Sequence, residues 1–195
     1  MEIDPQSHEG SLYRTLSGLV VPRPIGWIST RNADGVDNLA PYSFFNVVSV
    51  SPPIVGFSPI MRPDGRTDTA QNVRDTDEFV VNVVTHEFAE AMNRTSATLP
   101  ATDSEFDHAD LDRAASTRVS PSRVEGIAAA FECERYDIHE LGSNELILGE
   151  VVYVHVRDDV TTGGEVDVAK LDVVGRLAGS YYDRVTDRFR MERPE

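Results

Sequence analysis

Cysteine and lysine are almost absent from this chain of 195 residues, which contains one of each, Cys133 and Lys170. A single cysteine excludes an intrachain disulfide and any metal site built from several thiolates. Cys133 lies in "AAAFECERYDI", a pattern typical of a strand, so we expect a buried structural thiol, with a reactive nucleophile as the alternative. The five histidines form no pair at metal-ligand spacing, and the sequence therefore predicts no metal site.

Positive charge is also scarce, with 18 basic residues against 33 acidic ones and a formal net charge of -15. This excess of negative charge disfavours binding to nucleic acid or to an anionic membrane, because both carry negative phosphates. An anionic ligand would need a local pocket that opposes the overall field. An acidic, lysine-poor surface suits high salt, where repulsion is screened. A GC-rich genome, which encodes Arg, Asp and Val often, is the alternative explanation.

Long hydrophobic runs are missing as well, since no stretch approaches the ~20 apolar residues of a membrane-spanning helix. The first residues, "MEIDPQSHEG", are acidic and polar, unlike a secretory signal, so we expect a cytoplasmic protein. Hydrophobic residues make up 40% of the chain, which is enough for one sizeable core. We therefore expect a single domain over residues 1–195.

Short apolar runs separated by turn residues predict a mainly β protein. The expected elements, in chain order, are two strands in "PIGWISTRNADGVDNLAPYSFF" joined at Asp34-Gly35, a strand in "PPIVGFSP", a turn at Pro63-Asp64-Gly65, a helix in "TDTAQNVRDT" with Thr67 or Asp68 as N-cap, a strand in "EFVVNVVT", a helix in "HEFAEAMNRTS", an irregular excursion over 97–126, two strands flanking Gly142-Ser143, and a last strand in "SYYDRVTDRFRM". This order favours a closed or nearly closed β-barrel with small helical caps.

The segment "GRTDT" over 65–69 is the clearest local signal for a ligand. A glycine turn leads into a helix whose first N–H groups lack partners, and Arg66, Thr67 and Thr69 add further donors. This combination is a candidate phosphate cradle. An ordinary capped helix with one surface arginine explains the same residues.

The segment "NLAPYSFFNVVSVSPPIVGFSP" mixes aromatic, proline and hydroxyl residues in a way that a plain strand does not need. Its amides and hydroxyls could pair with the edge of a planar heteroaromatic ring while its aromatic side chains cover a face. A pair of core strands whose serines bond within the sheet is the alternative. No Gly-x-Ser-x-Gly, Walker or Gly-x-Gly-x-x-Gly motif is present, so an enzyme of this sequence would rely on a bound cofactor.

Four blocks in order resemble the flavin reductase-like family of FMN-binding split-barrel proteins, which includes flavoredoxin and the reductase components of two-component monooxygenases. They are "VPRPIGWISTRNADGVDNLAPYSFFNVVSVSPPIVGFSP", "DGRTDTAQNVRDTDEFVVNVV", "AFECERYDIHELGSNELILGEVVYVHV" and "VGRLAGSYYDRV". The resemblance covers about residues 18–186. It implies a six-stranded Greek-key barrel with short capping helices, a homodimer, and one FMN per subunit near the dimer interface, FMN being favoured over FAD.

The resemblance also implies which residues hold the cofactor. The ring would lie against Asn38, Ala40, Pro41, Tyr42, Ser43 and Phe44, the phosphate and ribityl groups against Ser58, Arg66, Thr67 and Thr69, and Tyr181 or Tyr182 would close over the flavin. If Arg66 clamps the phosphate, Arg66→Ala should weaken FMN binding much more than riboflavin binding. No catalytic side chain is predicted.

Two positions depart from the family pattern. Thr67 stands where many relatives have a lysine, and Glu105 stands where relatives often have another, in a pattern like Asp-Lys-Phe. The second change removes a cation that could help to fix the phosphate or a pyridine nucleotide.

Three functions remain open at this point. The resemblance implies an NAD(P)H-dependent flavin oxidoreductase with hydride transfer to flavin N5, serving a flavin or a redox partner protein. The alternatives are a flavoredoxin-like electron carrier without its own NAD(P)H oxidase activity, and a barrel that has lost flavin. His155, in "VVYVHV", is expected to be a hydrogen-bonded barrel or interface residue in preference to a proton donor.

Overall fold

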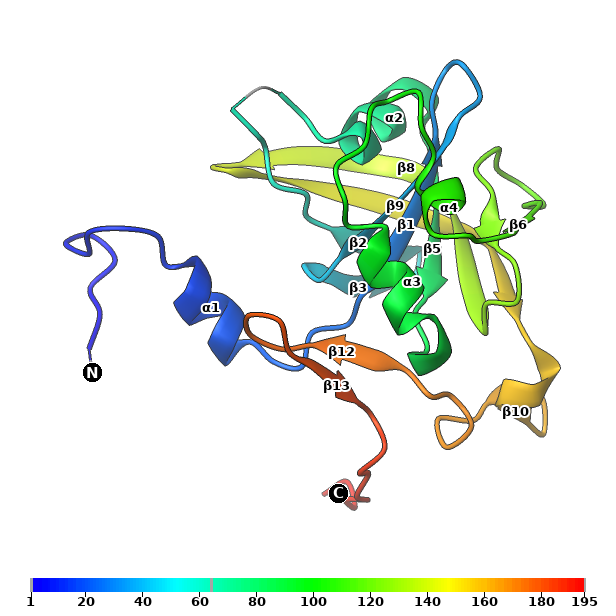
Figure 1. Cartoon of the computed structure of the whole chain (residues 1–195). Coiled ribbons are helices and arrows are strands. Elements are labelled where there is room, and N and C mark those ends of the chain that lie inside the picture. The colour runs from blue at the N-terminus through cyan, green and yellow to red at the C-terminus, as the bar shows by residue number, and fades with distance from the viewer. Residues whose placement is uncertain (1, 64, 195) are drawn as a thin grey trace.

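The computed structural model describes residues 2–63 and 65–194 and shows a mainly β protein with few short helices (Figure 1). Asp64, the middle of the turn predicted at 63–65, lies outside the described residues. The elements are α1 (Tyr13–Leu19), β1 (Gly26–Arg31), β2 (Asp37–Tyr42), β3 (Phe45–Val50), β4 (Pro53–Phe57), α2 (Asp68–Thr76), β5 (Glu78–Val83), η1 (His86–Phe88), α3 (Ala89–Arg94), α4 (Glu105–His108), β6 (Arg113–Ala114), β7 (Arg123–Val124), β8 (Ala129–Leu141), β9 (Asn144–Val156), η2 (Asp158–Val160), β10 (Thr161–Thr162), β11 (Glu165–Val166), β12 (Val174–Arg176) and β13 (Tyr182–Arg184).

The principal sheet is antiparallel and contains seven strands in the order β2-β1-β5-β8-β9-β4-β3. Its two edge strands, β2 and β3, follow each other in the chain and are separated only by Ser43 and Phe44. The chain thus runs from one edge of the sheet to the other without the edges pairing, and the barrel stays open there. The mainly β, barrel-like architecture with short helices is confirmed, with one strand more than the six expected.

The predicted hairpin between β1 and β2 is confirmed, and its turn depends on local side-chain chemistry. Asn32 Oδ1 accepts hydrogen bonds from the backbone N–H groups of Asp34 (3.0 Å) and Val36 (2.9 Å). Gly35 adopts a φ of 84°, in the left-handed region that favours glycine. The turn brings Asn38 opposite Thr30 in the pairing register.

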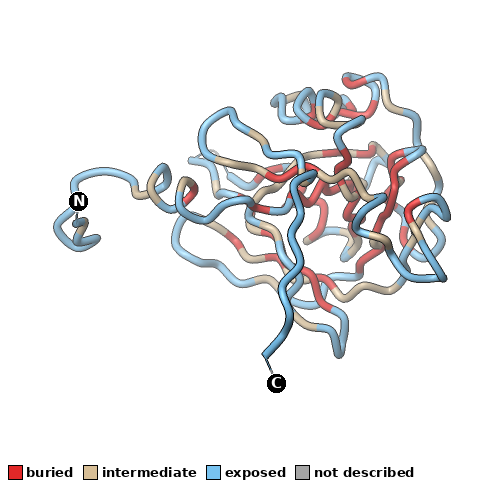
Figure 2. Tube along the Cα trace, turned by 90° about the horizontal axis from the view of Figure 1, so that it is seen from below, coloured by how far each residue is buried: buried red, intermediate tan, exposed pale blue. Residues whose placement is uncertain are grey.

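The core consists of two apolar clusters within the barrel, and Figure 2 shows the buried residues gathered in the body of the molecule. In one cluster, Trp27 is fully buried and donates from Nε1 to Thr95 Oγ1 at 2.8 Å. In the other, the rings of Tyr42, Phe57 and Phe79 contact one another in turn, in tilted and edge-to-face geometry, with centroids 5.1 and 5.3 Å apart. Cys133 belongs to this second cluster, and burial raises the pKa of its thiol, as expected for a structural cysteine.

Helix α2 forms where the sequence predicts it, with Thr67 as N-cap accepting from the backbone N–H of Ala70 at 3.3 Å. The helix predicted in "HEFAEAMNRTS" is divided into η1 and α3, because Phe88 takes a non-helical ψ of 0° between them. The last predicted strand is limited to Tyr182–Arg184, which pairs with β12. Beyond it, Phe189 and Met191 are largely exposed and have no core to join.

The excursion over 97–126 is mostly irregular, as predicted, and the buried side chain of Asp37 fastens it to the barrel. Ser122 Oγ donates to Asp37 Oδ2 at 2.7 Å, and Arg31 donates to both carboxylate oxygens at 2.9 and 3.0 Å. Ser104 Oγ donates to the Asp37 carbonyl oxygen at 2.5 Å. Because Asp37 begins β2, these bonds place the excursion beside Asn38.

Candidate functional site

The structure brings most of the predicted site residues to two adjoining cavities beside β2. One cavity has a volume of about 180 Å³, and the other about 530 Å³; they share Pro41, Tyr42 and Ile60. The predicted residues that line them come from three chain segments: β2 with the corner after it, the residues after β4, and the start of α2. All predicted site residues except Arg66 and Tyr181 line one or both cavities, namely Asn38, Ala40, Pro41, Tyr42, Ser43, Phe44, Ser58, Thr67 and Thr69.

The smaller cavity lies at the N-terminus of α2. Thr67, Asp68 and Thr69 contribute to its wall, and Arg62 stands beside them. The backbone N–H groups of the first helical turn and the positive end of the helix dipole favour an anion at such a position. Tyr42 OH donates to Thr67 Oγ1 at 3.4 Å, which joins the helix start to β2.

The side chain of Asn38 is held at both ends of its amide. Its Oδ1 accepts from Thr69 Oγ1 at 2.7 Å and from Thr30 Oγ1 at 3.3 Å. Its Nδ2 donates to Glu105 Oε2 at 2.9 Å. These partners fix the amide orientation, so Asn38 presents one defined face toward the cavity.

Glu105 lines the smaller cavity. From the sequence it was noted only because it replaces a positively charged residue. It is buried, and Oε2 also accepts from the backbone N–H of Leu39 at 3.0 Å. Burial raises the pKa of its carboxyl group, and the hydrogen bonds from Leu39 and Asn38 oppose that rise. Glu105 therefore positions β2 and Asn38 at this wall.

Replacing Glu105 by glutamine is expected to change the pH dependence of stability. Because the pKa of Glu105 is higher in the folded than in the unfolded state, the folded protein holds more protons between those two pKa values. The free energy of unfolding of the wild type should therefore decline as pH rises through that window. In Glu105→Gln this contribution is absent, because glutamine does not titrate. Urea denaturation at several pH values measures the difference, with the exposed Glu125→Gln as control. Parallel pH profiles for wild type and Glu105→Gln would contradict the expectation.

The larger cavity is mostly aromatic and apolar on the β2 side, with Pro41, Tyr42 and Phe44. Two segments that the sequence did not point to complete it: Ser11 and Tyr13 from the N-terminal arm, and Ser143 and Asn144 from the turn between β8 and β9. The ring of Tyr13 lies 6.3 Å from that of Phe44 with an interplanar angle of 38°. A planar ligand at this wall would thus meet aromatic side chains from two segments far apart in sequence.

A third cavity, of about 290 Å³, shares Pro41 with the other two and is lined by one of the two C-terminal tyrosines. Tyr182 lines it and donates to Asn93 Oδ1 at 3.3 Å, with Arg176 stacked 4.5 Å from its ring centroid. Tyr181 is 75% exposed and lines none of the three cavities.

Arg66 lines none of the three cavities and belongs to an ion cluster. Its Nε donates to Glu145 Oε1 at 2.7 Å, and its Nη2 donates to Glu140 Oε1 at 2.9 Å. Arg74 Nη2 donates to the same Glu145 oxygen at 2.7 Å. Burial would raise the pKa of Glu145, but the two guanidinium groups lower it on balance. Ser58 is tied to the same residue, since its Oγ donates to the Glu145 carbonyl oxygen at 2.8 Å.

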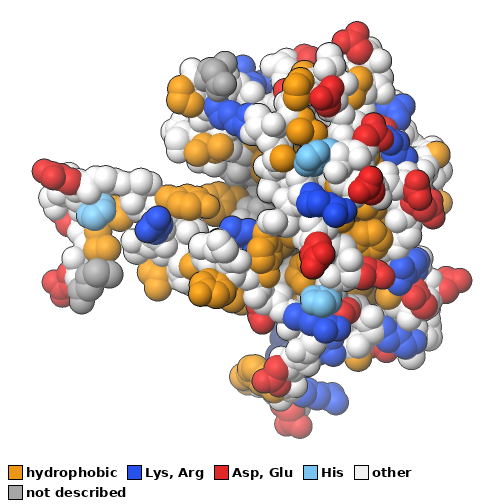
Figure 3. Space-filling model, viewed as in Figure 1, with side chains coloured by type: hydrophobic (Ala, Val, Ile, Leu, Met, Phe, Trp, Pro, Cys, Tyr) orange, Lys and Arg blue, Asp and Glu red, His pale blue; other side chains and the backbone are white. Residues whose placement is uncertain are grey.

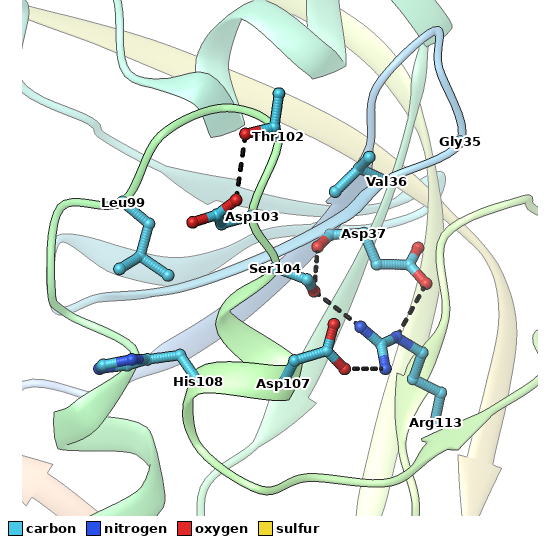
Figure 4. A pocket seen from close by; sticks show the side chains of 10 residues that line it. All are labelled: Gly35, Val36, Asp37, Leu99, Thr102, Asp103, Ser104, Asp107, His108 and Arg113. Atoms are coloured by element: carbon cyan, nitrogen blue, oxygen red, sulfur yellow. Dashed lines mark hydrogen bonds and ion pairs between the residues drawn. The ribbon is translucent and has the colours of Figure 1, made fainter.

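Another cavity, of about 740 Å³, is lined by residues of the β1–β2 turn and of the 97–126 excursion and by no predicted site residue (Figure 4). Arg113 crosses it and donates to Asp107 Oδ1 at 2.7 Å and Ser104 Oγ at 2.8 Å, with Asp37 Oδ2 3.4 Å from its Nε. These bonds fasten the excursion to β2. Among the described residues, no group of three or more His, Cys, Asp or Glu side chains could hold a metal ion.

His155 has the structural role expected for it. Its Nε2 lies 2.5 Å from Glu132 Oε1, and Glu132 is fully buried. The pair lies on β8 and β9, and none of the three cavities around Pro41 includes either residue.

Comparison with known proteins assigns the chain to a family. Residues 17–173 match the sequence model described as the flavin reductase like domain. The chain belongs to the flavin reductase-like family. The joined cavities of this flavin reductase-like protein are lined by most of the residues that the resemblance pointed to, and Arg66 and Tyr181 lie outside them.

Solved structures agree with this assignment. Nitrilotriacetate monooxygenase component B from Bacillus cereus is 30% identical, with a TM-score of 0.94 over 98% of both chains. The 2-nitrobenzoate 2-nitroreductase NbaA from Pseudomonas fluorescens is 29% identical, with a TM-score of 0.90 over 100% of this chain and 96% of the other. A split-barrel protein from Shewanella frigidimarina is 22% identical, with a TM-score of 0.85 over the whole of both chains, which shows the fold. The flavin reductase-like chain is thus a split barrel. Within its described part, no helix is both long and apolar enough to span a membrane.

Proposed function

We propose that the protein binds FMN in the joined cavities and acts as an NAD(P)H-dependent flavin oxidoreductase. The observation that carries this proposal is the convergence of three separate segments, β2, the residues after β4 and the start of α2, on one continuous site. The larger cavity alone falls in the range of roughly 300–1,000 Å³ typical of small-molecule sites. Membership of the flavin reductase-like family supports the same cofactor.

The side chains present suit each part of FMN. Thr67 and Thr69 offer hydroxyl groups beside the positive end of α2, where a phosphate would be stabilised. Pro41, Tyr42 and Phe44 offer flat apolar surface for the ring, and Asn38 offers an oriented amide for a polar edge. The donor set therefore fits an elongated ligand with an anionic end and a planar heteroaromatic end.

A bound flavin would supply the redox chemistry, accepting a hydride equivalent and passing the electrons on. The role of the protein is then to position two substrates and to exclude water, and no acidic or basic side chain is required for hydride transfer itself. Asn38, held by Thr69 and Glu105, orients one edge of the site. The neighbouring cavity around Asn93, Arg176 and Tyr182 provides room next to Pro41 for a second ligand.

Glu105 favours a second candidate function, an electron carrier without NAD(P)H oxidase activity. This carboxyl group lines the smaller cavity, where relatives of the family often have lysine, and it gives an additional anionic nucleotide no attraction there. The names of the similar structures, a monooxygenase component and a nitroreductase, favour an oxidoreductase.

Exposed apolar surface supports the proposal of a homodimer. On β3, an edge strand, Val47, Val48 and Val50 are 59%, 55% and 85% exposed. Hydrophobic side chains also gather along the N-terminal arm (Figure 3), where Leu16 and Leu19 are mostly exposed. Apolar surface on an edge strand and on an outlying helix is typical of a subunit interface. Light scattering on the purified protein should give twice the 21.5 kDa chain mass.

Two measurements test the proposed function. Titration of FMN with the protein in high-salt buffer should quench flavin fluorescence at micromolar concentrations. Addition of NADH or NADPH to the complex should then lower absorbance at the nicotinamide band. Tight FMN binding without oxidation of either nucleotide would favour the electron carrier, and absence of FMN binding would refute both candidates.

A further inference from the structure

We infer that Arg62, and not Arg66, supplies the positive charge that recognises the phosphate group of the flavin. This inference rests on the proposed function, because it concerns which residue holds one end of the same ligand. It changes the expectation drawn from the sequence, in which the arginine of "GRTDT" was the only candidate.

Arg66 is committed to Glu145 by geometry and by burial. The Glu145 side chain is 1% exposed, and its Oε1 depends on Arg66 Nε and Arg74 Nη2, each at 2.7 Å. Within the described structure, Glu145 Oε2 already has no hydrogen-bond partner. If Arg66 turned toward a ligand, a buried carboxylate would keep only one of its two donors, which is costly. Arg66 is therefore held by Glu145 and Glu140, and it lines neither of the joined cavities.

Arg62 stands on the cavity side of the same turn. It lines the smaller cavity together with Thr67 and Thr69, and its side chain enters none of the ion pairs found among the described residues. Its backbone is held in place by two hydrogen bonds with Gly65, from Arg62 N to Gly65 O at 2.8 Å and from Gly65 N to Arg62 O at 3.1 Å. The backbone of Arg62 is thus fixed close to the helix start, and no ion pair among the described residues occupies its guanidinium group.

The electrostatics of the cavity agree with this placement. Burial raises the pKa of Tyr42, whose hydroxyl group bonds to Thr67, and the charge of Arg62 opposes that rise. The positive charge of Arg62 therefore acts on Tyr42 at the cavity wall. Asp68 also lines the cavity, and the whole chain carries a net charge of -15, so a phosphate requires a local cation at this point. Arg62, the helix start and the two threonine hydroxyls together provide the donors that a phosphate monoester needs.

The test compares FMN with riboflavin, which lacks the phosphate, in wild type, Arg62→Ala, Arg62→Lys and Arg66→Ala. Fluorescence quenching gives the Kd of each protein for FMN and for riboflavin. Thermal denaturation reports whether each variant is folded. Arg62→Ala should raise the Kd for FMN on the order of tenfold or more and change that for riboflavin by less than about twofold, consistent with loss of a charge-assisted hydrogen bond. Arg62→Lys should recover part of the loss. Arg66→Ala should lower the melting temperature and affect both flavins alike.

Each contrary result is decisive. If Arg66→Ala weakens FMN selectively with an unchanged melting temperature, or if Arg62→Ala weakens FMN and riboflavin equally, the assignment to Arg62 is wrong while flavin binding stands. If the folded wild type binds neither flavin, the proposed function fails and this inference fails with it. Selective loss of FMN in Arg62→Ala alone would establish the assignment.

Discussion

Replacing Glu132 by alanine is expected to lower the free energy of unfolding by about 3–5 kcal/mol, the range for removing one partner from a buried charged network. Glu132 is fully buried and accepts hydrogen bonds from the backbone N–H groups of Thr117 (2.7 Å) and Arg118 (2.5 Å). His155 Nε2 lies 2.5 Å from the same carboxylate. The truncation removes a fully buried carboxylate and leaves these three partly buried donors without their acceptor.

Urea denaturation of Glu132→Ala measures the loss, and Glu134→Ala is the matched control. Glu134 lies two residues along β8 and is exposed, so its removal should change stability by less than about 0.5 kcal/mol. A similar free energy of unfolding for both variants would show that the hydrogen bonds to Glu132 stabilise the protein no more than an exposed glutamate does.

The same residue gives a signed pH effect. Burial would raise the pKa of Glu132, but the hydrogen bonds from His155, Thr117 and Arg118 lower it on balance. A carboxyl group whose pKa is lower in the folded state contributes stability above its unfolded value near 4.5, and this stability disappears as pH falls through the folded value. Acid unfolding of Glu132→Gln should therefore be less steep than that of the wild type below about pH 4.5. If stability falls equally with decreasing pH in the wild type and in Glu132→Gln, the lowered pKa of Glu132 is contradicted.

Replacing Gly149 by alanine is expected to destabilise the barrel by about 1–3 kcal/mol, the usual cost of overpacking a core. A Cβ at Gly149 would lie 2.2 Å from Cζ of Phe79 and 3.1 Å from Cβ of Cys133. Phe79 is fully buried and stacks on Phe57, which stacks on Tyr42 at the candidate site. Displacement of Phe79 should therefore also weaken flavin binding, since Tyr42 joins both cavities.

Gly56→Ala is the control for this prediction. Gly56 lies on the neighbouring strand β4, and its added Cβ would meet the methyl groups of Leu148 at 3.0 Å and Val48 at 3.1 Å. These side chains are not fully buried and can move by a few tenths of an ångström. Chemical denaturation should show a loss below about 1 kcal/mol, and an equal loss for both glycine variants would refute the steric argument.

Local elements were predictable because their determinants lie close together in the sequence. Asp34-Gly35 and Asn32 specify the β1–β2 turn within five residues, and Thr67 specifies the start of α2 through Ala70 three residues later. The helix predicted after β5 was less accurate. Phe88 breaks it, and that residue packs against Trp27 with ring centroids 6.2 Å apart, a contact across the fold that no local pattern contains.

The amino-acid sequence by itself determined the mainly β class and the strand order along the chain, and it pointed to the segment from Asn38 to Phe44, most of which lines the joined cavities. Tertiary structure decided which charged side chains face that wall. Arg66 and Arg62 lie in one turn, and the direction of Arg66 depends on Glu145, which is distant in sequence and buried by the sheet. Glu105 and Tyr182 likewise reach the cavities through contacts that only the folded chain creates. The physical reason is that the conformation of a backbone turn is set by residues next to it in the sequence. The partner of a charged side chain is instead set by the opposite charge that the fold buries beside it, which can be distant in sequence.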